Sequence, residues 1–490
     1  MERPGTLARI LTLAVLLAVA TGARPVLATD AATAKTATAA AKPNIVYIVA
    51  DDLGWKDVGF HGSDIRTPNI DQLAAQGARL EQFYTQAFCT QTRAALLTGR
   101  YPLRYGLQTV VIPSNGTYGL ATDEWLLPQA LQAAGYDTAI VGKWHLGHAK
   151  REYWPKQRGF DHQYGPLLGE IDYFTHEAHG TRDWFRDEKP AKEEGYVTTL
   201  LGNDAVRLIE KHDTEKPLFL YLAFTAPHAP YQAPQEYLDK YKSIEDPSRR
   251  AYAAMITAMD DQIGRVLAAL DARGMRENTI VVFHSDNGGT RSAKFTGEID
   301  MSKATIPCDN GPWREGKGTL YEGGTRVVSL IDWPGRIAPG TVVDEAIQVV
   351  DMYPTLARIA GAKPGDKPLD GVDAWPTIAE GKPSARTEVV YNVEPLMAGL
   401  RQGPWKLVWK TSLPSQVELF DLANDPGEKT NVAAEHPEIV AKLEERVQQL
   451  SRESVPPLLL QAASGAAMKE LFGSVALPPG SDAEKIDVPL

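Results

Sequence analysis

Cysteine is scarce in this sequence, since 490 residues contain only Cys89 and Cys308. Two cysteines allow at most one disulfide, which excludes a disulfide-rich scaffold. Positive charge is also in the minority, with 51 lysines and arginines against 62 aspartates and glutamates. The net charge of −11 argues against a nucleic-acid partner, which would need a basic face, but it leaves room for a local cationic pocket.

Long apolar runs are equally rare. The run at residues 10–20 follows Arg3 and Arg9 and is too short to span a bilayer comfortably. It predicts a signal peptide over residues 1–28, followed by a flexible leader over residues 29–42 that lacks large apolar side chains. No later stretch is long and apolar enough to cross a membrane. We therefore expect an exported protein, periplasmic or secreted, without stable membrane insertion.

Strand and helix patterns alternate along most of the chain. Continuous apolar runs rich in β-branched residues predict buried strands at residues 44–50, 137–141, 218–224 and 279–283. The helices expected between them lie at residues 68–77, 126–134 and 251–270. This alternation predicts an α/β fold in which helices cover both sides of a mostly parallel sheet.

A smaller unit is expected towards the C-terminus. Residues 405–410 and 417–421 have strand patterns and residues 437–451 a helix pattern, which together predict a four-stranded antiparallel sheet with a helix packed on it. The expected divisions of the chain are a large domain at 43–380, a C-terminal subdomain at 381–453 and a tail at 454–490. The tail contains one short helical pattern, at residues 466–471.

Charged or metal-binding residues follow each of the four predicted strands. In chain order they are Asp51 and Asp52, then Lys143 and His145, then His228, and last Asp286 and Asn287. Any one of them alone would more often be a cap or a structural residue. Because ligands bind at the carboxyl ends of strands in open α/β sheets, four such cases together predict a site at this edge.

The candidate site residues fall into two chemical sets. One offers only oxygen ligands and suits a hard cation such as Ca²⁺ better than Mg²⁺ or zinc: Asp51, Asp52, Asp286 and Asn287. The other set is cationic and suits a sulfate or phosphate group: Arg93, Lys143, His145, His228 and Lys317. Cys89 precedes a predicted helix at residues 92–97, whose N-terminus would attract anions and lower the pKa of the thiol. Cys89 is therefore the predicted nucleophile position.

Several blocks of the sequence resemble the type I sulfatase family. CTQTRAALLTGR, which begins at Cys89, resembles the first signature of the family, and GYDTAIVGKWHLG is similar to the second. ADDLGW, APHAP, SDNGG, WREGKGTLYEGGTRV and ELFDLANDPGEKTNVA match further blocks in family order. The similarity covers residues 43 to about 450. RYGLQ, RGFDHQYGPLLGEIDYFTHE and KPLDGVDAWPTIAEGKPSARTE look most like the arylsulfatase B group.

The resemblance implies an alkaline-phosphatase-like sandwich with residues 43–380 as the catalytic domain. It implies hydrolysis of an aryl sulfate or a sulfated sugar, including the 4-sulfate of N-acetylgalactosamine. In this family a formylglycine-generating enzyme converts the signature cysteine, here Cys89, to formylglycine (3-oxoalanine), whose hydrated gem-diol is the nucleophile. One Ca²⁺ would be held by residue 89 together with the oxygen ligands Asp51, Asp52, Asp286 and Asn287.

The resemblance also implies a role for each cationic residue. Arg93 would hold the diol and the metal-site carboxylates, and Lys143 and Lys317 would neutralise sulfate oxygens. His145 would take the proton of the diol, and His228 would protonate the leaving oxygen, together with Lys317.

Other interpretations stay open. A phosphate or phosphonate monoester hydrolase of the same superfamily shares the fold, although such phosphatases usually use Ser or Thr and two zinc ions. An inactive protein that binds sulfated glycans would result if Cys89 were not converted. Gln91 bears on that conversion, because the family motif has proline or alanine at this position.

The sequence allows two interpretations for each of two segments. Cys308 lies in an expected loop over residues 290–317, either as a free buried thiol or as the disulfide partner of Cys89. The aromatic-rich residues 173–185 either line the substrate entrance or cover the edge of the sheet.

Overall fold

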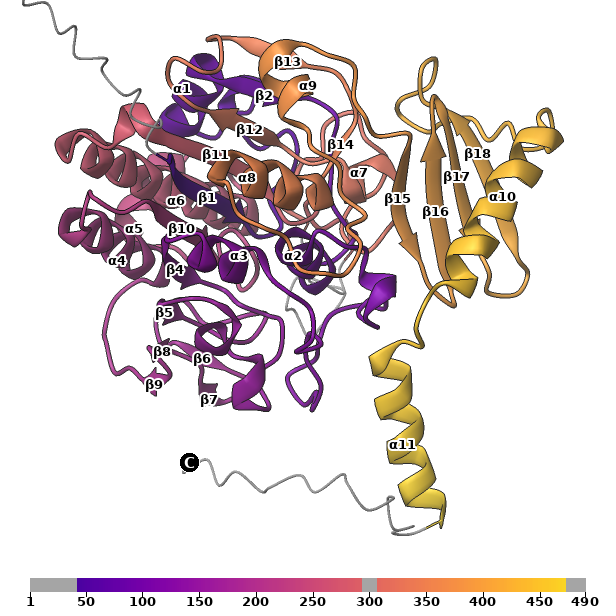
Figure 1. The fold of residues 1–490 in the computed structure, drawn as a ribbon, viewed down its shortest axis with the longest axis horizontal. Helices are drawn as coiled ribbons and strands as arrows, with labels where there is room; N and C mark the ends of the chain where they lie inside the picture. The colour runs from indigo at the N-terminus through magenta and orange to yellow at the C-terminus, as the bar shows by residue number, and fades with distance from the viewer. Residues whose placement is uncertain (1–41, 293–305, 473–490) are drawn as a thin grey trace, which may run out of the picture. The chain divides into compact units, whose positions relative to one another are not determined.

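The computed structural model describes residues 42–292 and 306–472 (Figure 1). The predicted signal peptide and leader lie outside these residues, apart from Lys42. So do residues 293–305 of the expected loop and residues 473–490 of the expected tail. Among the described helices, none combines the length and the apolar character needed to span a bilayer.

The described residues form a ten-stranded mixed sheet. Its centre is parallel, in the order β11-β1-β10-β4-β5, and antiparallel pairs join β12 and β8 to the two ends of this centre. In sheet order the strands are β13 (Thr341–Val343), β2 (Ala78–Leu80), β12 (Ser329–Asp332), β11 (Thr279–Ser285), β1 (Asn44–Ala50), β10 (Leu218–Ala223), β4 (Asp137–Gly142), β5 (His162–Gly165), β8 (Phe185–Arg186) and β9 (Lys189–Pro190). The predicted α/β fold with a mostly parallel sheet is confirmed.

Strand β1 shows why the sheet needs helices on both faces. Successive side chains of a strand point to opposite faces, and all seven residues of β1 are buried. Ile45, Tyr47 and Val49 pack in one apolar core with residues of α2 (Cys89–Thr98), α3 (Leu127–Ala133) and α8 (Met352–Ala360). Val46, Ile48 and Ala50 pack in a second core with residues of α1 (Pro68–Gln76), α4 (Val197–Lys211) and α6 (Pro247–Ala272).

Shorter elements complete the large sheet region. The short helices are α5 (Gln235–Leu238), α7 (Glu322–Thr325) and α9 (Trp375–Glu380), and two small ribbons are formed by β3 (Phe83–Tyr84) with β14 (Ile347–Gln348) and by β6 (Glu177–Ala178) with β7 (Thr181–Arg182).

Element boundaries differ from the prediction where a polar residue begins or extends an element. Helix α6 begins four residues before residue 251, because the Asp246 side chain accepts a hydrogen bond from the Ser248 backbone N–H and Pro247 fits the first turn. Strand β11 runs two residues past Phe283. Its added His284 is buried and lies 2.9 Å from the hydroxyl of Tyr47, so a polar residue continues an apolar strand.

The C-terminal sheet has four antiparallel strands, as predicted: β15 (Glu388–Val393), β16 (Met397–Gln402), β17 (Trp405–Lys410) and β18 (Gln416–Asp421). Helix α10 (Pro437–Arg452) packs on one face through Leu443, Val447 and Leu450 (Figure 1). Helix α11 (Leu458–Phe472) begins eight residues before the helical pattern predicted in the tail. The domain divisions at residues 381 and 454 stay predictions.

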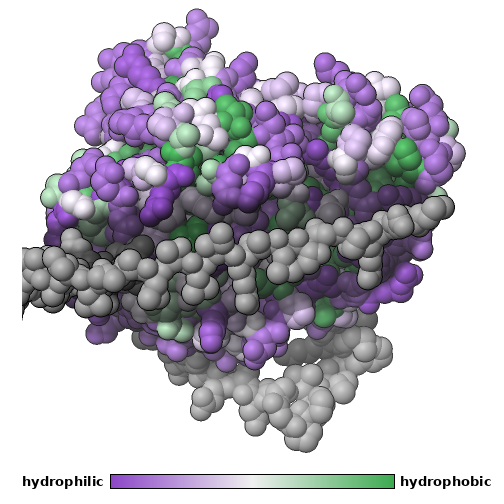
Figure 2. Space-filling model, turned by 45° about the horizontal axis from the view of Figure 1, so that its top comes forward, coloured by the Kyte–Doolittle hydropathy of each residue, from purple (hydrophilic) through white to green (hydrophobic). Residues whose placement is uncertain are grey.

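Exposed apolar residues are scattered over the described surface. The face in Figure 2 is mostly hydrophilic where it is not grey, with hydrophobic side chains in small groups. Exposed large apolar residues such as Trp125, Phe174 and Leu413 come from distant parts of the chain. Single exposed residues of this kind are normal on protein surfaces.

A buried ionic cluster joins the C-terminal sheet to the large sheet region. The ammonium of Lys406, on β17, lies 2.8 Å from a carboxylate oxygen of Glu322 and 2.8 Å from one of Glu428. Tyr84, on β3, donates a hydrogen bond of 2.9 Å to Glu322. All three charged side chains have no exposed surface. Burial raises the pKa of Glu428 to about 7, whereas Lys406 outweighs burial at Glu322 and lowers its pKa.

Removing the ammonium of this cluster should be costly, because it leaves two buried carboxyl groups without their cation. Lys406→Met should lower the free energy of unfolding by about 3–5 kcal/mol at pH 8. The loss should be smaller at pH 5, because a carboxyl group whose folded pKa is raised destabilises the fold only as the pH rises through that pKa. Urea denaturation at both pH values measures this.

Lys410→Met provides the matched control on the same strand. Lys410 is about half exposed and lies 3.7 Å from Glu418, so its removal should cost less than about 1 kcal/mol. Equal losses for Lys406→Met and Lys410→Met would contradict the importance of the buried cluster.

Candidate active site

The predicted site residues meet at the carboxyl ends of β1, β4, β10 and β11. The strands end in register, with Ala50 beside Ser285 and Ala223 beside Gly142. The next residues of the chain therefore lie side by side. One ligand atom from each of four residues falls within 4.8 Å of the others, and these residues are Asp51, Asp52, Cys89 and His228.

Charges alternate through this cluster. Lys143 Nζ lies 2.5 Å from Asp51 Oδ2, and Lys317 Nζ lies 2.8 Å from Asp52 Oδ2. Arg93, on α2, is 2.8 Å from Asp286 Oδ2. Within the described chain these three carboxylates and three cations are each at most 5% exposed. Their formal charges cancel.

The cations keep the buried carboxylates ionised. Burial works against ionisation of Asp51, but Lys143, His228 and Arg93 outweigh it and lower its pKa. At Asp52, Lys317 and His228 likewise outweigh burial and lower the pKa. Both aspartates are therefore available as anionic oxygen ligands at neutral pH.

The hydrogen bonds of the Asn287 side chain indicate whether these residues fit a hard cation. Its amide nitrogen donates to Asp52 Oδ1 at 2.7 Å and to the Gly288 carbonyl at 3.0 Å. Its amide oxygen is buried and accepts no hydrogen bond from any described residue. A buried amide oxygen normally has a partner, and the nitrogen of the same amide contacts the Asp52 carboxylate. The donor set is thus rich in oxygen and fits Ca²⁺.

The thiol of Cys89 lies on this floor, 3.5 Å from Asp51 Oδ1. Helix α2 begins at Cys89 itself, three residues earlier than predicted. The predicted lowering of the thiol pKa is wrong, because burial, followed by the Asp286 charge, raises the pKa of Cys89. An unmodified thiol here would stay protonated and would be a weak nucleophile.

The two cysteines do not form a disulfide, and both are free and buried. Cys308 packs behind the metal-ligand candidates, with Sγ 4.0 Å from the Asp52 carbonyl oxygen. The interpretation of Cys308 as a free buried thiol is confirmed.

His145 is held in an uncommon backbone conformation, with φ of 58°. Its Nε2 lies 3.1 Å from the Ile112 carbonyl oxygen, a contact with no signal in the sequence. Its Nδ1 is buried without a hydrogen-bond partner in the described chain. Burial, then Lys143 and Arg93, lowers the pKa of His145, so the ring is neutral at pH 7.

Residues 173–185 divide between the apolar core and the cavity. Tyr173 is buried and donates to the carbonyl oxygens of Thr225 at 2.7 Å and His228 at 3.0 Å, which fixes the loop that carries His228. Trp184 is also buried in the core. His179, in contrast, lines the cavity above Cys89.

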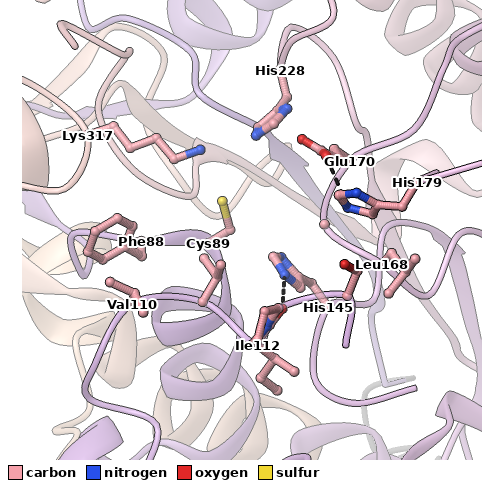
Figure 3. Close-up of a pocket in the computed structure, with 14 residues that line it drawn as sticks. Phe88, Cys89, Val110, Ile112, His145, Leu168, Glu170, His179, His228 and Lys317 are labelled. Atoms are coloured by element: carbon pink, nitrogen blue, oxygen red, sulfur yellow. Dashed lines mark hydrogen bonds and ion pairs between the residues drawn. The ribbon is translucent and has the colours of Figure 1, made fainter. Parts of the chain in front are cut away.

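This cavity has a volume of about 340 Å³ and opens over the charged floor (Figure 3). Cys89, His145, His228 and Lys317 form its polar end. Arg93, Asp51 and Asp286 lie behind these residues and do not line the cavity. The arrangement can hold an anion against Cys89, with neutral or cationic groups on several sides.

Comparisons with known proteins agree with this geometry. Residues 43–362 match the Sulfatase family, and residues 313–453 match the C-terminal domain of N-sulphoglucosamine sulphohydrolase. Arylsulfatase J of Mus musculus is 35% identical, over 85% of this chain and 77% of that protein. N-acetylgalactosamine-6-sulfatase of Mus musculus is 36% identical, over 60% of this chain and 58% of that protein. The crystal structure of Ps i-CgsB in complex with k-i-k-neocarrahexaose is 33% identical, with a TM-score of 0.77 over 85% of this chain and 94% of that one.

The chain belongs to the sulfatase family. It is a sulfuric ester hydrolase with the alkaline-phosphatase-like fold, and the predicted resemblance to type I sulfatases is confirmed. The finer likeness to the arylsulfatase B group stays a prediction.

Gln91, the departure from the family motif, is fully buried in this sulfatase. Its Nε2 donates to the Gln108 carbonyl oxygen at 2.6 Å, which links α2 to the segment that follows it. Gln91 lies in the first turn of α2, where a backbone N–H needs no partner within the helix. Proline would therefore fit this position of the fold.

Gly288 allows the loop after β11 to approach the 323–324 backbone. A Cβ atom at Gly288 would lie 1.8 Å from the Gly323 carbonyl oxygen, and the Gly288 N–H donates to the Gly324 carbonyl at 3.0 Å. Gly288→Ala should therefore displace the adjacent Asn287 and cost about 1–3 kcal/mol or more of stability. A lower melting temperature in calorimetry would show this.

Gly465→Ala is the matched control for this change, because a Cβ atom at Gly465 on α11 would meet nothing within 4 Å. That variant should unfold at the wild-type temperature or slightly above it. A Gly288→Ala variant with the same melting temperature as Gly465→Ala would rule out the tight approach.

Proposed function

We propose that this sulfatase removes sulfate from a sulfated sugar, with residue 89 as formylglycine and one Ca²⁺ at the strand ends. The main support is the position of Cys89 on the floor of a 340 Å³ cavity. Its sulfur lies within 4.8 Å of ligand atoms of Asp51, Asp52 and His228. The named relatives support a sugar substrate, since they include an N-acetylgalactosamine-6-sulfatase and a protein crystallised with a neocarrahexaose.

Formylglycine and Ca²⁺ would supply different chemistry. Formylglycine supplies a geminal diol in place of a thiol that would stay protonated. Asp51, Asp52, Asp286 and Asn287 would hold Ca²⁺, which would supply Lewis acidity towards a sulfate oxygen. The unpaired amide oxygen of Asn287 supports this ligand set.

The cations of the chain bind and orient the sulfate. Lys317 lines the cavity and is held by Asp52 at 2.8 Å, so it points its ammonium at the anion from a fixed position. Lys143 is held in the same way by Asp51. Arg93 donates to Asp286 and to the Lys143 carbonyl oxygen, so it fixes the strand ends relative to α2.

The two histidines transfer different protons, one at residue 89 and one at the leaving oxygen of the sugar. His145 is a neutral ring beside the floor and is suited to take a proton from the hydroxyl at residue 89. His228 lines the cavity 3.6 Å from Asp52 Oδ2, and a ring paired with a carboxylate is suited to protonate the leaving sugar oxygen.

The conversion of Cys89 is tested by co-expression with a formylglycine-generating enzyme and mass spectrometry of the tryptic peptide 80–93. An aldehyde-reactive residue at 89 together with turnover of 4-nitrophenyl sulfate is expected. Cys89→Ala should abolish turnover, whereas Cys308→Ala, which changes the other buried thiol, should keep most of it. Full turnover with unmodified Cys89 would contradict the mechanism.

Absence of both conversion and turnover would favour the glycan-binding alternative. In that case Gln91→Pro distinguishes poor recognition by the converting enzyme from loss of function. The substitution restores the motif and fits the first turn of α2, so it should raise the converted fraction.

The role of His228 is tested by its dependence on the leaving group. His228→Ala should lower kcat for a sulfated sugar by about 10²- to 10⁴-fold, because an alkoxide leaves poorly without a proton. The loss should be less than about tenfold for 4-nitrophenyl sulfate, whose phenolate leaves readily. Equal losses for both substrates would remove His228 from the general-acid role.

We also propose export to the periplasm or the exterior. The basic and apolar pattern of residues 1–28 supports this proposal. N-terminal sequencing of the mature protein tests it, and retention of residues 1–28 in the purified native protein would contradict it.

A further inference from the structure

The cavity above Cys89 has two unlike walls that the proposed mechanism does not use. Phe88, Val110 and Ile112 contribute an apolar wall. Glu170 and His179 contribute a polar wall, and Figure 3 shows this pair on the opposite side of Cys89 from Phe88 and Val110. The sulfate-binding floor lies between them.

The polar wall is an imidazole and a carboxylate in close contact at the cavity rim. His179 Nε2 lies 3.1 Å from Glu170 Oε1, and the side chains are 50% and 44% exposed. The pair is therefore open to solvent and to a ligand. Each side chain keeps further hydrogen-bonding capacity, since a carboxylate has a second oxygen and an imidazole a second nitrogen.

The backbone holds His179 firmly. His179 and Gly180 form the two-residue turn between β6 and β7, with φ of 51° and 80°, which is the pattern of a type I′ hairpin. The base of the hairpin is anchored by His176, which is buried, stacks on Trp184 and lies 2.9 Å from the Gly195 carbonyl oxygen. An exposed side chain thus projects from a fixed scaffold.

Glu170 is positioned by the loop that covers His145. The carboxylate of Asp183 accepts hydrogen bonds from the backbone N–H groups of Leu167 at 3.1 Å and Leu168 at 2.8 Å. A Cβ atom at Gly169 would lie 2.3 Å from the His145 ring, so the loop passes directly over that ring. Glu170 therefore directly follows Gly169, the residue at which this loop passes over His145.

We propose that Glu170 and His179 form a subsite for the hydroxyl groups of the sugar that carries the sulfate, which deepens the proposed function and rests on it. A pyranose is amphipathic, with C–H groups that pack on apolar side chains and hydroxyl groups that bind carboxylates and imidazoles. The apolar wall at Phe88, Val110 and Ile112 contacts the C–H groups, and the Glu170–His179 pair binds the hydroxyl groups. The carboxylate of Glu170 also repels a second sulfate or carboxylate at that position, so the subsite selects a sugar that is neutral there.

The test compares two kinds of substrate, an aryl sulfate and sugar sulfates, in the full-length, converted enzyme. The kcat/KM values are measured for 4-nitrophenyl sulfate, which has no sugar, and for the 4-sulfate and 6-sulfate of N-acetylgalactosamine and of galactose. His179→Ala and Glu170→Gln should lower the ratio of sugar-sulfate to aryl-sulfate kcat/KM by about tenfold to a hundredfold, mainly through KM, as expected for the loss of a hydrogen bond to a charged group. Glu170→Gln should also narrow the preference for N-acetylgalactosamine 4-sulfate over N-acetylgalactosamine 4,6-disulfate.

His436→Ala is the matched control, since His436 is 37% exposed, lies 3.8 Å from Glu438 and is not part of the cavity. It should leave the ratio unchanged. Equal losses on both kinds of substrate in His179→Ala, or no loss on either, would overturn the subsite. Wild-type turnover of the aryl sulfate with none of the sugar sulfates would overturn both the subsite and the proposed sugar substrate, and would leave the formylglycine mechanism of sulfate-ester hydrolysis standing. Turnover of neither kind would mean that this proposed mechanism has failed as well.

Discussion

The site depends on the pairing of three buried carboxylates with three buried cations at the ends of parallel strands. Asp51, Asp52 and Asp286 have almost no exposed surface, and an isolated charge there would cost several kcal/mol. Each is held within 2.8 Å of a lysine or arginine, so the cluster as a whole carries no formal charge. This charge balance keeps three neighbouring carboxylates ionised although they are buried. A hard cation needs such anionic oxygen ligands.

The strand ends position the carboxylates, and the counter-charges come from helix α2 (Arg93), from the residue after β4 (Lys143) and from the segment before α7 (Lys317). Strands β1, β4, β10 and β11 end in register, so the chain delivers its acidic residues to one edge. Arg93 reaches that edge from α2 and binds both Asp286 and the Lys143 carbonyl oxygen. Helix α2 also carries Cys89, so the proposed nucleophile position is held beside the metal-ligand candidates. The surrounding loops are then left to determine which molecule enters.

The sequence predicts the strand-end residues well, because an apolar run followed by Asp-Asp or Asp-Asn is a local pattern. It fails where a property depends on distant neighbours. The pKa of Cys89 is raised rather than lowered, since burial and the Asp286 charge outweigh the start of α2. The contact between His145 and the Ile112 carbonyl joins segments 33 residues apart and leaves no mark in the sequence. The pairing of Glu170 with His179 is likewise a product of the β6–β7 hairpin.

The calcium site proposed at these strand ends is made of oxygen ligands. Metal analysis by mass spectrometry tests it most directly, on enzyme purified and then dialysed against equal concentrations of Ca²⁺, Mg²⁺ and Zn²⁺. We expect about one calcium per chain, because the ligands are carboxylate and amide oxygens. Stoichiometric zinc, or no bound divalent metal at all, would contradict it.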